Sequence, residues 1–493
     1  MSTTEPRVSA VSTRRDGAEA AARPTLTLAV ASLGTFLVLV AFTSTVTTVA
    51  PTAAALHAAA AGRTWILGGI SLGLAVSLLA LGEIADGRGR RRVFVWSTVG
   101  LVLTSLGGGL APTIAVLVAA RILEGIACAG ILASGLGLIG RAFPAGPART
   151  RATGLWGATL GAGIAAGPAA SAALAALGSW RTIYWVVAGA AALLVPLACR
   201  VADSRRESKR RLDLAGIVIF AAAMGALTTG LTLGRRSWTG FGTVVLLIAA
   251  VALLLAFIVV ERIVSHPLLQ LGLFKRPLFI ASSTGALFTG LALIAPMSFL
   301  PLLTQKALGQ TALGSAGTLA LWSVPSMLVA TQARRLPTGI GSSMRLAIGF
   351  VLCGLGLAAL SGLSIHAPWA HLVVGLAIAG VGSGLINAAL GRLAVESVPL
   401  EHAAMGSGAN NTARYLGGAA GIAIVVALVA AGGDAPGAVG LVHGWNLAAT
   451  VAFSLCMLAA LISAGCELVQ RARRRVPVDR PLLTAVLSME ECE

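Results

Sequence analysis

Fourteen long apolar runs limit what this chain can fold into more than any other feature of the sequence. They lie between residues 26 and 466 of a chain of 493 residues. A run of about 18 apolar residues or more spans the hydrocarbon core of a bilayer as a helix. Only 11% of the residues are charged, whereas soluble domains carry roughly 25%. The sequence therefore predicts an all-α polytopic membrane protein with 14 transmembrane helices.

The basic residues between the runs indicate the orientation of the helices. With the N-terminus assigned to the cytoplasm, 29 of the 36 Lys and Arg residues fall on the cytoplasmic side and 5 on the outside. Cytoplasmic loops of membrane proteins carry such an excess. The net charge of +18 is thus explained by topology and by contacts with anionic lipid headgroups, and we expect no nucleic acid partner. We predict a multi-pass protein of the cell membrane with both termini in the cytoplasm.

The spacing of the runs predicts an internal organisation of six, two and six helices. Duplicated six-helix bundles are typical of transporters, whose substrate site lies near the midplane between the halves. The predicted segments are a cytoplasmic mobile tail (1–24), an N-terminal six-helix bundle (25–203), a basic linker with an inserted helix pair (204–277), a C-terminal six-helix bundle (278–466) and a cytoplasmic tail (467–493).

A glycine- and arginine-rich turn, GEIADGRGRRR, separates the second run from the third at residues 82–92. A carboxylate near a helix end can pair with a guanidinium or with the N-terminus of a neighbouring helix, and such a pair can lock one conformer and release in the other. We predict a conformational-switch loop here, and the alternative is a turn that only sets topology. Its candidate residues are Gly82, Asp86, Gly89, Arg90, Arg91 and Arg92.

This turn resembles the loop signature of the major facilitator superfamily, G-x-x-x-D-x-x-G-[RK]-x-[RK]. The residues that match are Gly82, Asp86, Gly89, Arg90 and Arg92. The family has an arginine directly after the aspartate, and this chain has Gly87 there, followed by Arg88. The resemblance implies the major facilitator fold, with two six-helix bundles and, in this chain, two inserted helices.

Two charged residues lie deep in the fourth run, Arg121 and Glu124 in AARILEGIACAG. A charge at the centre of a membrane helix costs at least ~2.5–3.5 kcal/mol, which makes both residues functional candidates. They lie one turn apart on the same helix face. One interpretation is a proton-titrating carboxylate whose protonation responds to Arg121, and the other is a structural ion pair. The segment is similar to the R-x-x-[QE]-G segment of the same superfamily.

The fifth run, GLWGATLGAGIAAGPAASAAL, carries a stripe of small residues and a proline. By itself, such a stripe indicates only close packing of two helices, and the proline adds a kink. The run also resembles the exporter signature of the superfamily, G-x-x-x-G-P-x-x-G-G, although Ser171 and Ala172 replace its last two glycines. The candidate residues are Gly157, Gly161, Gly163, Gly167 and Pro168.

Further segments, among them ANNTARYLGGAAG (409–421), extend the resemblance over about residues 26–466. With the inserted pair, the chain resembles the fourteen-helix drug/proton antiporter branch of the superfamily, of the multidrug and quaternary-ammonium efflux type. That branch often has an acidic residue where this chain has Phe42, which weakens the case for a permanently cationic substrate. Our candidates for the substrate cavity are Phe42, Thr45, Asn387, Asn410, Asn411 and Arg414.

The resemblance implies a proton-coupled exporter, or antiporter, of amphipathic small molecules. The alternative on the same fold is a dedicated exporter of an endogenous metabolite, a lipid or a self-made antibiotic, and a transporter-like receptor is a rival from another class. We do not expect an enzyme, because the sequence has no nucleophile–base pair, metal-ligand spacing or phosphate-binding loop. We expect no cofactor or metal, the proton gradient as energy source, and protons, membrane lipids and a small amphipathic substrate as partners of a monomer.

Overall fold

The computed structural model describes residues 24–58, 60–203, 213–234, 237–264, 267, 269–332, 335, 339–365, 369–431 and 437–475. The described part of the chain contains helices and no strands, and 14 of its helical spans are long and apolar enough to cross a membrane. The predicted fold class is thereby confirmed. The predicted tail 1–24 and the basic linker fall almost entirely outside the described residues.

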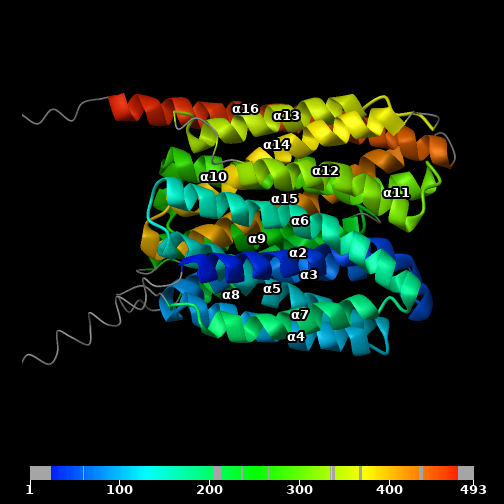
Figure 1. Ribbon diagram of the computed structural model, residues 1–493, viewed down its shortest axis with the longest axis horizontal. Coiled ribbons are helices and arrows are strands. Elements are labelled where there is room, and N and C mark those ends of the chain that lie inside the picture. The colour runs from blue at the N-terminus through cyan, green and yellow to red at the C-terminus, as the bar shows by residue number, and fades with distance from the viewer. Residues whose placement is uncertain are drawn as a thin grey trace, which may run out of the picture.

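Six helices form the first half of the bundle (Figure 1). They are α2 (Pro24–Ala55), α3 (Ala60–Arg88), α4 (Arg90–Leu110), α5 (Ile114–Ala142), α6 (Pro147–Leu177) and α7 (Thr182–Cys199). The second half contains α10 (Pro277–Thr289), the π-helical turn η2 (Gly290–Ile294), α11 (Ala295–Lys306), α12 (Ala312–Gln332), α13 (Ser342–Leu360), α14 (Trp369–Glu396), α15 (Ala403–Ala431) and α16 (Ala438–Arg475). The short 3-10 turns η1 (Leu271–Lys275) and η4 (Leu400–His402) precede α10 and α15.

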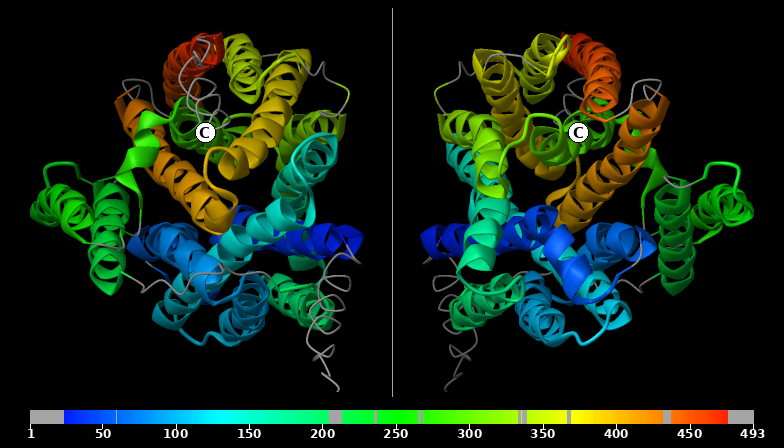
Figure 2. Two further views of the ribbon diagram at one scale, coloured as in Figure 1. Left: turned by 90° about the vertical axis from the view of Figure 1, so that its left-hand side faces the viewer. Right: turned by 90° about the vertical axis from the view of Figure 1, so that its right-hand side faces the viewer.

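The inserted helices α8 (Leu214–Gly234) and α9 (Phe241–Ile263) lie outside the two halves (Figure 2). α8 packs on α3 and α15, so the pair covers the side of one seam between the halves. Phe220 of α8 and Phe257 of α9 meet with their ring centroids 5.0 Å apart and join a small core with α3 and α15 residues. The pair is therefore attached to the bundle without being part of either half.

The two halves repeat one packing scheme. In each half the first helix packs on the fifth, the second on the fourth and the third on the sixth, as in α2 with α6, α3 with α5 and α4 with α7. The corresponding pairs of the second half are α10 and η2 with α15, α12 with α14, and α13 with α16. The halves meet along two seams of the same kind, α3 with α15 and α6 with α12.

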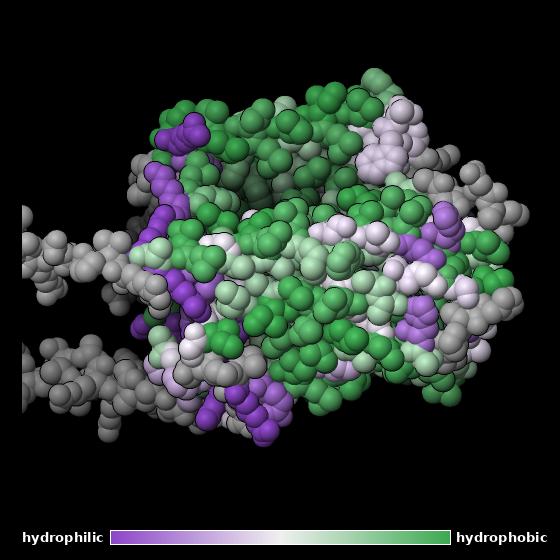
Figure 3. Space-filling model, turned by 90° about the horizontal axis from the view of Figure 1, so that it is seen from above, coloured by the Kyte–Doolittle hydropathy of each residue, from purple (hydrophilic) through white to green (hydrophobic). Residues whose placement is uncertain are grey.

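The outer surface of the bundle is apolar between two polar ends (Figure 3). Large side chains such as Leu193, Phe241 and Ile248 are exposed on it. In a soluble protein this surface would drive aggregation, whereas lipid tails cover it at no cost. α2 begins and α16 ends at the same end of the bundle, where the turn Arg88–Arg92 also lies (Figure 1). We call this the Arg-rich end.

Several helices extend beyond the predicted runs. α6 begins at Pro147, six residues before the predicted start at 153, and α16 continues to Arg475, into the segment predicted as a tail from 467. Hydropathy detects the part of a helix that lies in hydrocarbon, whereas backbone hydrogen bonds continue a helix beyond that part, into turns that carry charged residues. The extra turns carry Arg149 and Arg471.

Candidate functional site

A buried carboxylate joins the two halves at the Arg-rich end. Asp86, near the end of α3, is 0% exposed and accepts the backbone N–H groups of Ala404 (3.1 Å) and Met405 (2.8 Å). These amides belong to the first turn of α15, whose free N–H groups and dipole favour an anion. The contact has the geometry that the sequence suggests for a conformational-switch loop, and the switching role itself remains a prediction.

Arg90 completes this junction from α4. Its guanidinium lies 2.6 Å from the Asp86 carboxylate and donates to the carbonyl of Leu400 at 2.9 Å and to that of Gly137 at 3.3 Å. Gly82 permits the close approach, because a Cβ atom there would lie 2.7 Å from the carbonyl oxygen of Ala404. We call Gly82, Asp86 and Arg90, with their partners on η4 and α15, the latch.

The other residues of the turn serve a different contact, within the first half. Arg91 donates its backbone N–H to the Asp203 carboxylate at 3.1 Å, and the Arg92 side chain lies 3.8 Å from the same group. Gly89 has a φ of +117°, and a Cβ atom there would also meet this carboxylate. Gly89, Arg91 and Arg92 therefore contact the segment that follows α7, and Asp203 was not among the predicted residues.

The glycines of the exporter-signature helix α6 face two neighbours. Gly163 lies against the backbone of α2, where a Cβ atom would be 2.8 Å from the Phe36 carbonyl oxygen, and Gly167 lies against Val40 of the same helix. Gly157 and Gly161 face the second half instead, against Asn387 of α14 and Ser323 of α12. α6 is thus packed tightly on both sides, between α2 and the second half.

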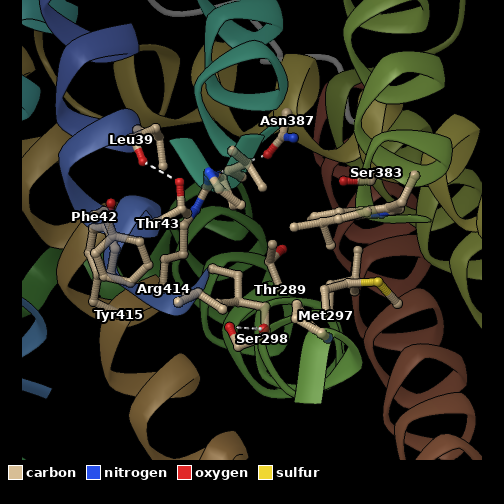
Figure 4. A pocket seen from close by; sticks show the side chains of 18 residues that line it. Leu39, Phe42, Thr43, Thr289, Met297, Ser298, Ser383, Asn387, Arg414 and Tyr415 are labelled. Atoms are coloured by element: carbon tan, nitrogen blue, oxygen red, sulfur yellow. Dashed lines mark hydrogen bonds between the residues drawn. The ribbon is translucent and has the colours of Figure 1, made fainter. Parts of the chain in front are cut away.

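A central cavity of about 700 Å³, its open mouth included, lies between the halves (Figure 4). Its walls come from the middle of α2, α6, α12, α14 and α15 and from η2 with its flanking helices. Pro168, which lies inside α6, is part of the lining. The cavity is mostly apolar, with a few polar groups, as ligand sites of transporters are.

Three of the six predicted cavity residues line this cavity, namely Phe42, Asn387 and Arg414. The other three are not among its lining residues. Thr45 accepts a hydrogen bond from Arg121 at 3.2 Å, Asn410 donates to Ser282, and Asn411 donates to the Ser407 carbonyl of its own helix. The polar groups of Thr45 and Asn410 therefore join helices, and that of Asn411 bonds within α15, uses that a sequence cannot separate from substrate binding.

The aromatic and sulfur-containing side chains of the lining other than Phe42 were not among the predicted residues. Tyr415 packs on Phe42 with ring centroids 5.3 Å apart, and Met297 lies on the wall opposite (Figure 4). Trp322 also lines the cavity. The π-helical turn η2 was also missed. A Cβ atom at Gly290 would overlap the backbone of α15 beside Arg414. Such turns often occur at functional sites.

Arg121 and Glu124 form a buried ion pair behind α2. The Arg121 Nη1 lies 2.8 Å from the Glu124 carboxylate, and the side chains are 0% and 2% exposed. Glu124 also accepts a hydrogen bond from the Ser105 hydroxyl at 3.0 Å. The same Arg121 Nη1 donates to the Ala41 carbonyl of α2 at 2.9 Å. The pair thus touches the helix segment whose next residues, Phe42 and Thr43, line the cavity.

Metal ligation finds no support in the part of the chain that the structure describes. No group of three or more His, Cys, Asp or Glu side chains comes close enough to hold an ion there. The cysteines described by the structure, Cys128, Cys199, Cys353, Cys456 and Cys466, are unpaired thiols.

Comparison with known proteins gives relatives over most of the chain. The multidrug resistance protein Stp of Mycobacterium tuberculosis is 31% identical over 375 residues, covering 75% of this chain and 69% of that protein. The tetracenomycin C resistance and export protein of Streptomyces glaucescens is 29% identical, covering 83% of this chain and 76% of that protein.

The fold is also that of solved structures. The proton:xylose symporter XylE aligns with a TM-score of 0.66 at 14% identity, covering 90% of this chain and 95% of that chain. The family model of the Major Facilitator Superfamily matches residues 31–422. With the repeated halves, the fourteen apolar spans and the latch between the halves, this match shows that the chain is a multi-pass membrane protein that belongs to the Major Facilitator Superfamily.

Proposed function

We propose that this protein is a proton-coupled exporter, or antiporter, of amphipathic small molecules. The single observation that carries the proposal is the contact of the buried Arg121–Glu124 pair with the cavity-lining segment of α2. The names of the relatives support export of drugs or antibiotics, because one is a multidrug resistance protein and another exports tetracenomycin C.

The Arg-rich end is the cytoplasmic end in this proposal, because the excess of Lys and Arg predicts it. The latch then closes the cytoplasmic side of the central cavity, and both termini lie in the cytoplasm. Substrate and proton act by binding the inward-facing and the outward-facing conformers with different affinity.

Protonation of Glu124 would change the hydrogen bonds that Arg121 makes to α2. The neutral acid no longer balances the guanidinium, and a buried unbalanced charge is costly. Arg121 would then shift its hydrogen bonds toward the remaining acceptors on α2, the Ala41 carbonyl and the Thr45 hydroxyl. Because Phe42 lies between these two residues and lines the cavity, protonation and substrate binding would be coupled.

The test measures proton movement driven by substrate in proteoliposomes that enclose a pH-sensitive dye. An inward gradient of a fluorescent amphiphile should drive protons outward, with ethidium, dansylglycinamide and dansylglycine as probes of different charge and protein-free liposomes as the blank. Glu124→Gln should abolish the proton signal while binding of the active probe is retained. The proposal fails if no probe moves protons, or if Glu124→Gln couples as well as the wild type.

Two further variants separate coupling from folding. Arg121→Gln combined with Glu124→Gln removes both charges, so no unbalanced arginine is left, and it should fold while it remains uncoupled. Glu467→Gln is the matched control, because Glu467 is a buried carboxylate paired with Arg471 at 3.0 Å in α16. Glu467→Gln should leave the proton signal unchanged.

A dedicated exporter of one endogenous metabolite, lipid or self-made antibiotic is the second candidate. Two observations favour it: Phe42, in place of an acidic residue, lines the cavity, and a relative is named for a single antibiotic. A response to only one narrow chemical class in the same assay would support the dedicated exporter, and a response to many unrelated amphiphiles would support the multidrug type.

A further inference from the structure

We propose that Arg414 binds an anionic oxygen group of the substrate, so that the exporter takes apolar or aromatic acids, with a carboxylate as the simplest case. The inference rests on the proposed function, because it names the class of molecule that enters the same cavity. It predicts a specificity opposite to that of a cation exporter.

The first support is the unsatisfied state of Arg414. The residue is 6% exposed and lines the cavity, and its Nη1 donates to the amide oxygen of Asn387 at 3.3 Å. Its Nε is buried without a hydrogen-bond partner. A guanidinium carries five N–H donors in a planar fork that matches a carboxylate. Most of this donor capacity is therefore unused beside an open space.

The second support is the charge of the cavity. Arg414 is the one charged side chain among the lining residues, and within the described part of the chain no carboxylate lies within ion-pair distance of it. Arg121, the other arginine deep in a span, has Glu124 at 2.8 Å. Of these two arginines deep in membrane spans, Arg121 is neutralised by the chain and Arg414 faces the cavity. A buried charge without a counter-charge is costly, and an anionic substrate that enters the cavity would supply the counter-charge.

The third support is the shape of the surrounding wall. Figure 4 shows Arg414 between the Phe42–Tyr415 ring pair and Asn387, with Met297 and Thr289 across the cavity. An aromatic body can pack on the rings while its acid group reaches the guanidinium, and Asn387 offers an amide beside it. A permanent cation at the same place would be repelled by Arg414 at low dielectric. The wall therefore fits an aryl acid.

The opposing interpretation makes Arg414 a structural residue that only holds Asn387 and the α14–α15 contact. The two interpretations differ in one measurable quantity, the preference for an acid over its uncharged amide. Substitution of a structural arginine changes the affinity for the acid and for the amide equally. Substitution of an anion-binding arginine changes the ratio of the two affinities.

The test uses dansylglycine and dansylglycinamide, which share one aromatic body and differ in the charge of one group. Binding to the purified full-length protein in detergent is followed by dansyl fluorescence at neutral pH. The wild type should bind dansylglycine at least tenfold more tightly than the amide. Arg414→Gln should reduce this ratio to about one, and Arg414→Lys, which keeps the charge without the fork, should retain an intermediate ratio.

Lys306→Gln is the matched control, because it removes a positive charge of the same half that does not line the cavity. It should leave the ratio unchanged. Equal thermal unfolding of all variants shows that they fold. The inference is overturned if the wild type does not prefer the acid, if it does not bind dansylglycine, or if Arg414→Gln keeps the preference.

This outcome is independent of proton coupling. Ethidium or dansylglycinamide that moves protons without any preference for the acid would support the proposed function and refute the anion site. An Arg414-dependent preference without proton flux would do the reverse.

Discussion

The two seams between the halves have the same architecture and different chemistry. In both, the fifth helix of one half crosses the second helix of the other, α15 on α3 and α6 on α12, with glycines at the contact. The α3–α15 seam ends in the latch, where Asp86 binds Arg90 and two backbone amides of α15. No side-chain hydrogen bond or ion pair joins α6 to α12 within the described residues.

This difference predicts that the α3–α15 seam is the harder of the two to open at the Arg-rich end. Separating α3 from α15 would expose a buried carboxylate and break charged hydrogen bonds, whereas α6 and α12 can slide on apolar and glycine surfaces. Charge-assisted hydrogen bonds are about twice as strong as neutral ones. The seams occupy equivalent positions in the repeat, and the α3–α15 seam differs in carrying a buried carboxylate, Asp86, that bridges the two halves.

Removing the Asp86 charge should produce the largest difference between the two seams. Breaking a buried ion pair costs ~3–5 kcal/mol, so Asp86→Asn should open the α3–α15 seam. Amide hydrogen exchange measured by mass spectrometry should accelerate at least tenfold in peptides that contain Ala404 and Met405, while peptides of α6 and α12 keep their rates. Unchanged exchange at these two amides would show that the latch does not hold the seam.

Adding one methyl group to a glycine of each seam should reveal a smaller difference between the seams, in thermal stability. A Cβ atom at Gly82 would lie 2.7 Å from the Ala404 carbonyl oxygen, whereas one at Gly161 would lie 3.2 Å from that of Ser323. Overpacking typically costs ~1–3 kcal/mol, so Gly82→Ala should lower the unfolding temperature in detergent clearly and Gly161→Ala only slightly. Equal decreases in the unfolding temperature for Gly82→Ala and Gly161→Ala would contradict this difference between the seams.

The smallest effect is expected at an ion pair on α14, which packs on both helices of the other seam, α6 and α12. Arg392 pairs with Glu396 at 2.7 Å, but the side chains are 28% and 23% exposed. Partly exposed pairs of this kind contribute ~0–1 kcal/mol, and salt weakens them. Glu396→Gln should therefore leave hydrogen exchange in α6 and α12 within about twofold of the wild type. A change as large as that of Asp86→Asn would mean that a second latch exists.

Much of the site was predictable because its signals are local. Helix geometry places Arg121 and Glu124 on one face, and the structure shows them as an ion pair. Asp86 meets both partners that its chemistry suggests, a guanidinium and a helix N-terminus. Polarity alone made Thr45, Asn410 and Asn411 cavity candidates, and in the structure their side chains bond to Arg121, to Ser282 and to the Ser407 carbonyl of the same helix.

The sequence by itself determined the number of spans, the six-two-six order and the presence of three charges that hydrocarbon would not tolerate alone, Arg121, Glu124 and Arg414. Span length and charge cost are properties of single segments, so no neighbour is needed to read them. Only the tertiary structure decided that α8 and α9 cover the α3–α15 seam, that Asp86 reaches a helix more than three hundred residues away, and that Glu124 neutralises Arg121 while Arg414 faces the cavity. The physical reason is that lipid and protein interior are equally apolar, so a helix that is hydrophobic all round does not reveal which face meets a partner, a cavity or the membrane.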